Sequence, residues 1–90
     1  MTTVYLRHPD LRLTAVDNEG VVLHLGSLSY FSVNETGLTI LAALEQPRTL
    51  DELVTAVTAE YEVSDAEALE TTREFLARCT EAKLLLLEER

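Results

Sequence analysis

The chain has 90 residues, of which 47% are hydrophobic, and its 16 acidic and 7 basic residues give a formal charge of −9. This composition suits one folded domain spanning residues 1–90 and excludes a disordered chain. The charge disfavours nucleic acid and anionic membranes as partners, and either favours a cationic partner or simply keeps a small domain in solution. The sequence shows no run of about 18 apolar residues and no signal peptide, so we expect no membrane association and a cytoplasmic location.

Three strands are predicted after an extended lead-in over residues 1–10. Residues 11–15 alternate apolar and polar side chains, as a half-buried strand does. Residues 17–20 form a turn, and the β-favouring runs 21–25 and 28–33 flank Gly26-Ser27, a pair typical of a tight hairpin loop. Sequential strands joined by short turns predict an antiparallel meander.

The hairpin loop determines how its two strands pair. A two-residue loop places Leu23 opposite Tyr30 and Val21 opposite Ser32. We expect one apolar face of the sheet to point at the helices, and the face that carries His24 to be more mixed. The expected core face includes Leu11, Leu13, Ala15, Val21, Leu23, Leu25 and Leu28.

Three helices are predicted next. Asn34 can cap a helix over residues 36–45, which ends before Pro47. The segments Thr49-Leu50-Asp51-Glu52 and Ser64-Asp65-Ala66-Glu67 both match the capping-box pattern and predict the starts of two further helices. Residues 84–87 are expected to be a closing strand or an apolar cap. The expected buried residues are Leu50, Leu53, Val54, Val57 and Tyr61 in the second helix and Leu69, Thr72, Phe75, Leu76 and Cys79 in the third.

Residues with catalytic chemistry are scarce. Cys79, the single cysteine, falls on the apolar stripe of the third helix, which predicts a buried thiol. His8 and His24 are the only histidines, and no spacing resembles a metal site, a nucleophile–base pair or a phosphate-binding loop. We therefore expect no enzymatic activity, no metal and no cofactor.

The third strand of the meander has a partner on one side only. Its free edge over residues 28–33 contains neither a charge nor a proline, the features that usually protect such an edge. An extended peptide can pair there as an additional strand. The alternative is that the edge is covered by the chain's own N-terminus or by residues 84–87.

Several motifs together resemble the PqqD-like family, the RiPP recognition elements. They are His8-Pro9, the hairpin, the Tyr30–Gly37 junction from strand to helix, the segment Gln46–Leu53 and Phe75-Leu76, in an order that spans nearly the whole chain. The resemblance implies an α+β, winged helix-turn-helix-like fold with a three-stranded antiparallel sheet followed by three helices. It also implies a protein that binds the leader segment of a ribosomally made precursor and works with a leader peptidase and a cyclase in a lasso peptide pathway.

In the resembled family the leader lies between the third strand and the third helix. The resemblance therefore implies that Arg73 pairs with a leader carboxylate and that Glu70 or Glu74 pairs with a leader lysine, while apolar residues hold leader anchors. The implied peptide-binding residues are Ser29, Tyr30, Phe31, Ser32 and Val33 in the strand and Leu69, Thr72, Arg73, Leu76, Ala77 and Thr80 in the helix.

Three other functions stay open at this point. One is a PqqD-like chaperone of a different peptide-modification pathway. Another is a winged-helix regulator of DNA, although residues 65–83 carry five acidic and three basic side chains, the wrong sign for a helix that reads a groove. The last is a dimerisation module in which two open strand edges pair with each other.

Overall fold

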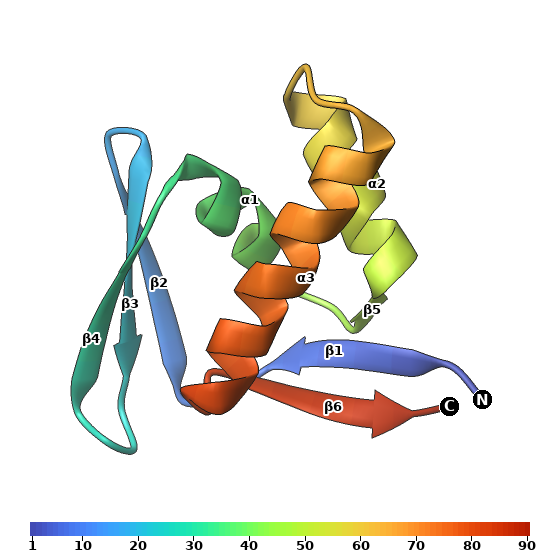
Figure 1. Ribbon diagram of the computed structural model, residues 1–90. Coiled ribbons are helices and arrows are strands. Elements are labelled where there is room, and N and C mark those ends of the chain that lie inside the picture. Colours follow the sequence, from blue (N-terminus) through green and yellow to red (C-terminus); the bar gives the residue numbers. More distant parts are fainter.

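A computed structural model describes residues 1–90 and contains two small sheets and three helices (Figure 1). The elements are β1 (Thr3–Arg7), β2 (Leu11–Val16), β3 (Glu19–His24), β4 (Ser29–Val33), α1 (Glu35–Ala43), β5 (Arg48–Thr49), α2 (Leu50–Glu60), α3 (Asp65–Glu81) and β6 (Leu85–Glu89). The predicted α+β architecture, with a three-stranded antiparallel sheet and three helices, is confirmed. The winged helix-turn-helix label stays a prediction.

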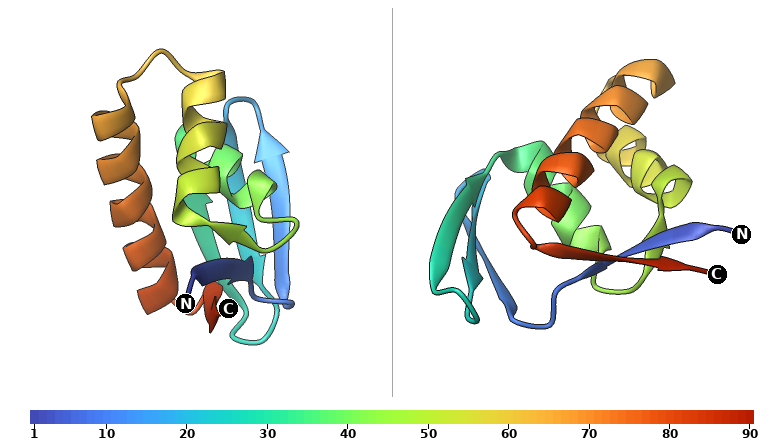
Figure 2. Two further views of the ribbon diagram at one scale, coloured as in Figure 1. Left: turned by 90° about the vertical axis from the view of Figure 1, so that its right-hand side faces the viewer. Right: turned by 60° about the horizontal axis from the view of Figure 1, so that its bottom comes forward.

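The strands form two antiparallel sheets with the orders β2-β3-β4 and β5-β1-β6. The first sheet is the predicted meander, and its hairpin has the predicted register, with Leu23 opposite Tyr30 and Val21 opposite Ser32. The second sheet was not predicted as a sheet: the N-terminal lead-in is β1, and its long-range partner β6 is the closing strand. Figures 1 and 2 show the two chain ends side by side at one end of the β1–β6 ribbon, away from the meander.

The predicted facing of the meander is wrong for β3 and for β4. The turn after β2 pairs Leu13 with Val22 and Leu11 with His24, and directly opposed residues share a face. The face that carries Leu11 and Leu13 therefore also carries the even-numbered residues of β3, and Val22 and His24 are buried. Because Phe31 is opposite Val22, the odd-numbered residues of β4 lie on the same face, and Tyr30 lies on the other. Leu25 and Leu28, both expected in the core, are 40% and 75% exposed.

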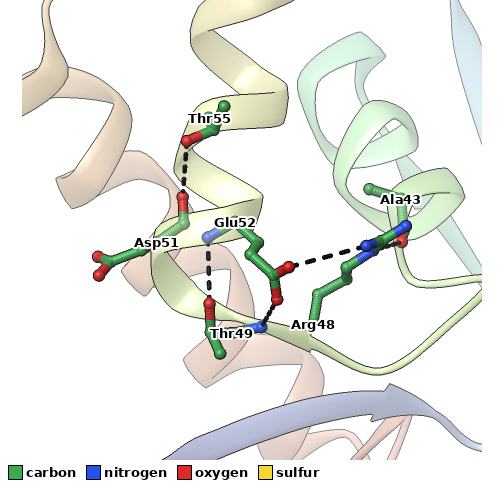
Figure 3. Close-up of polar contacts among 6 residues, drawn as sticks. All are labelled: Ala43, Arg48, Thr49, Asp51, Glu52 and Thr55. Carbon is green, nitrogen blue, oxygen red and sulfur yellow. Dashed lines mark hydrogen bonds and ion pairs between the residues drawn. The ribbon is translucent and has the colours of Figure 1, made fainter.

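The helices begin at the caps that the sequence predicts. The side chain of Asn34 accepts a hydrogen bond from the amide of Gly37 at the start of α1. At the start of α2, Thr49 and Glu52 make both hydrogen bonds of a capping box, and Arg48 forms an ion pair with Glu52 (Figure 3). Ser64 accepts a hydrogen bond from the amide of Glu67 and caps α3. Side chains at these positions satisfy amides that the helices leave without partners.

The core lies between the β2-β3-β4 sheet, the helices and β6. All three helices and the start of β6 contribute, and only Val22 represents the meander among its fully buried members. The buried cluster consists of Val22, Ile40, Leu41, Leu44, Leu53, Val57, Ala68, Phe75, Leu76, Cys79, Leu84 and Leu85. The predicted burial of Cys79 is confirmed. The three helices are too short or too polar to cross a membrane.

Candidate peptide-binding edge and pocket

The outer edge of β4 has no partner in the structure. β4 pairs with β3 alone, and none of the 15 backbone hydrogen bonds outside the helices and strands involves residues 29–33. The two chain ends do not cover it, because β1 and β6 pair with each other in the second sheet. This finding excludes the alternative in which the N-terminus or residues 84–87 close the edge.

The register identifies which backbone groups face outward. The amide of Leu25 donates to the carbonyl of Asp10, so at this position β3 bonds toward β2. Because the bonding direction alternates along an antiparallel strand, Val22 and His24 bond toward β4. Their partners Phe31 and Ser29 bond back to β3. The amides and carbonyls of Tyr30 and Ser32 therefore point away from the sheet, where an added strand would pair.

An apolar pocket of about 340 Å³ lies beside this edge, between β4 and the C-terminal half of α3. Six of its nine lining residues are hydrophobic, and one is charged. The lining residues are Phe31, Ser32, Val33, Asn34, Phe75, Arg78, Cys79, Ala82 and Leu84. The volume is near the lower end of ligand-site volumes, about 300–1,000 Å³, and suits apolar side chains of a peptide.

The wall of the pocket depends on close packing between α1 and α3. Gly37 lies in the first turn of α1 against the ring of Phe75, so close that a Cβ on residue 37 would be 2.7 Å from Cε1 of that ring. At the other end, α3 stops in a left-handed residue, Lys83, and the amide of Leu84 donates to the carbonyl of Cys79. This helix-ending motif turns Leu84 back toward the pocket.

Burial raises the pKa of the Cys79 thiol to about 11, against a smaller opposing effect of the Arg78 charge. A thiol with this pKa stays protonated at neutral pH and behaves as a small apolar side chain. No three His, Cys, Asp or Glu side chains gather in a way that could hold a metal ion. The chemistry that this site offers is hydrogen bonding along a strand and burial of apolar groups.

The structure brings part of the predicted site together. In β4, Phe31, Ser32 and Val33 line the pocket, while Tyr30 is 72% exposed on the outer face and Ser29 lies near the hairpin turn. None of the predicted α3 residues lines the pocket: Thr72 and Leu76 are buried in the core, Leu69 and Thr80 are half-buried, and Arg73 and Ala77 are exposed. Whether these α3 residues touch a peptide stays a prediction.

The helical side of the pocket comes from residues that the sequence analysis did not assign to the site. At about 100° per residue, Phe75, Arg78 and Ala82 lie on one side of Thr72, whereas Leu69, Arg73 and Thr80 lie on the other. A signal was present in the sequence, because residues 75, 78, 79 and 82 recur at helical spacing along one flank of the apolar stripe.

Fold and site together define a small α+β domain that offers an unpaired strand edge beside an apolar pocket. The family model of coenzyme PQQ synthesis protein D (PqqD) matches residues 19–85. The chain therefore belongs to the PqqD family. A comparison with curated proteins finds no match.

Two solved structures are similar over nearly the whole chain. One is TbiB1 in complex with the TbiA(beta) leader peptide, with a TM-score of 0.79, 30% sequence identity, and coverage of 89% of this chain and 93% of that chain. The other is a lasso peptide synthetase B1 complexed with the leader peptide, with a TM-score of 0.76, 22% identity, and coverage of 91% and 96%. The second likeness bears on the fold alone.

Proposed function

We propose that this chain binds the leader segment of a ribosomally synthesised precursor peptide by strand addition to β4. The observation that carries the proposal is the position of the outward-facing backbone groups of Tyr30 and Ser32 directly beside the apolar pocket. Main-chain hydrogen bonds then supply affinity, and the pocket selects the side chains. Membership of the PqqD family and the 30% identity to TbiB1, which was solved with a leader peptide, support the same function.

The role proposed for this chain is presentation and not catalysis. A bound leader holds its precursor near the enzymes that act on it and raises their effective concentration. In a lasso peptide pathway these enzymes are a leader peptidase and a macrolactam-forming cyclase. The state of Cys79 supports a role without catalysis, because burial keeps this thiol of the pocket protonated and therefore unreactive.

The test is fluorescence anisotropy with two labelled leaders. One is the TbiA(beta) leader, and the other is the leader of a precursor gene sought beside the gene for this chain. Ser32→Pro removes an amide that points outward and leaves the bonds between β3 and β4 intact, which an edge strand tolerates. We expect this variant to lower leader affinity by at least about tenfold, and Ser32→Ala, which keeps the amide, to bind like wild type.

A matched control lies on the other open edge of the same sheet. By the same alternation Ala15 points its amide away from β3 at the free edge of β2, so Ala15→Pro blocks that edge only. We expect Ala15→Pro to bind the leader normally. Loss of binding in Ala15→Pro with retention in Ser32→Pro would move the peptide to β2, and a folded wild type that binds no leader would contradict the proposed function.

A further inference from the structure

Arg78 is the one charged side chain in the pocket, and the structure leaves it without a charged partner. The two ion pairs of the chain join Arg48 to Glu52 and Arg90 to Glu88. On its own helix Arg78 has Glu74 four residues before it and Glu81 three residues after it, and neither comes within ion-pair distance. A guanidinium is therefore free to bind a ligand at the wall of a mostly apolar pocket.

We propose that Arg78 selects a leader carboxylate that lies on the same face of the bound strand as the apolar anchor. This inference rests on the proposed function and adds a specificity-determining residue to it. A guanidinium presents a planar fork of donors that matches a carboxylate, and it stays charged at all accessible pH values. The chain has 16 acidic and only 7 basic residues, so few positive groups on its surface compete with Arg78 for a leader carboxylate.

The geometry of strand addition restricts where that carboxylate can be. Side chains of a strand alternate between its two faces, so only every second leader residue points toward α3. The apolar anchor that fills the pocket is one of the leader residues that point toward α3. The nearest leader side chains on the same face are two residues before it and two residues after it. We therefore expect the Asp or Glu recognised by Arg78 two residues from the anchor.

The experiment is a double-mutant cycle by fluorescence anisotropy, with the labelled leader of the neighbouring precursor as the first probe and the TbiA(beta) leader as the second. Each leader Asp or Glu is replaced singly by Asn or Gln and titrated with wild type and with Arg78→Gln. We expect one replacement to weaken wild-type binding by about 3- to 10-fold and to have no effect in Arg78→Gln. A leader in which this acid is replaced by Lys should regain affinity for Arg78→Glu.

Arg73→Gln tests the earlier prediction that Arg73 pairs with the leader carboxylate. The matched control is Arg12→Gln, because Arg12 is an exposed arginine on β2, the strand of the meander that does not touch β4. We expect it to bind every leader variant as wild type does. Three results would overturn the role of Arg78 and leave leader binding intact. The leader acid could couple energetically to Arg73 and not to Arg78, its replacement could lower affinity equally in all protein variants, or a leader without acidic residues could bind as tightly. Absence of saturable binding by the folded wild type would overturn both proposals.

Discussion

Gly37 links the fold to the pocket, and replacing it by alanine perturbs both. In an exposed helix this change stabilises a protein by up to about 1 kcal/mol, because glycine has the greater backbone entropy to lose. Here the new Cβ would stand 2.7 Å from Cε1 and 3.0 Å from Cζ of Phe75, and 3.2 Å from Cβ of Val33. Both neighbours line the pocket, so the movement that relieves these contacts displaces its wall.

The expected net effect is a loss of stability. Overpacking of a core costs about 1–3 kcal/mol, which exceeds the helix gain. We expect Gly37→Ala to lower the free energy of unfolding by about 1 kcal/mol, equivalent to a fall in Tm of about 4–8 °C for a domain of this size. Thermal and urea unfolding followed by circular dichroism measure this change. Leader affinity should fall in the same variant, because Phe75 and Val33 both line the pocket and their displacement changes its shape.

Phe75→Leu provides the control, because a leucine lacks the ring atoms that collide with the new methyl group. Alone it leaves a cavity and destabilises the chain. In the Gly37→Ala background it should cost less, and the difference is a coupling energy between the two contacting residues. The reasoning is refuted if Gly37→Ala is more stable than wild type and binds the leader equally well, or if the two substitutions are simply additive.

Three further predictions concern single side chains. Thr72 is fully buried, and its hydroxyl has no hydrogen-bond partner, so Thr72→Val should raise the free energy of unfolding by about 1 kcal/mol. A lower free energy of unfolding would contradict this. The pKa of Glu52 lies below its ordinary 4.5, chiefly because its carboxylate accepts from the amide of Thr49. The ionised Glu52 carboxylate therefore stabilises the fold above pH 4.5, and this contribution is lost as the pH falls through the lower folded pKa. In urea unfolding, the difference in stability between wild type and Glu52→Gln should shrink below pH 4.5. A difference that stays constant with pH would contradict this. The rise of the Cys79 pKa from 9.0 to about 11 lowers its thiolate fraction at pH 8 by about 100-fold. The folded chain should therefore react with iodoacetamide at least about 100-fold more slowly than the urea-unfolded chain. Equal reaction rates would contradict the burial of this thiol.

Local rules of the sequence were enough to predict most elements of this fold. The cap at Asn34, the capping box of Thr49 with Glu52 and the hairpin register each depend on residues within a few positions of one another. The second sheet was missed because its main pairing joins Thr3 to Glu89, at opposite ends of the chain. No local pattern carries information about such a pairing.

The facing of β3 failed for a different reason. Apolar residues occupy both faces of this strand, from Val21 to Leu25, so its own pattern does not choose a side. The choice comes from the turn that joins it to β2, which opposes Leu13 to Val22. A change of one residue in the pairing would exchange the two faces, and the buried position of Val22 shows which face the helices select.

The site depends most on how α3 is rotated about its own axis, and the sequence gives the least information about this rotation. Its apolar stripe predicts that Thr72 and Cys79 face the core, and both are buried. The stripe does not say which of its two flanks turns toward β4, because that choice is made by packing against α2 and β6. One flank carries Arg78 and the other Arg73, so each rotation would give the pocket an arginine, and only the packing assigns it to Arg78. Binding measurements on Arg78→Gln and Arg73→Gln therefore measure the rotation of the helix in solution as well as the specificity of the site.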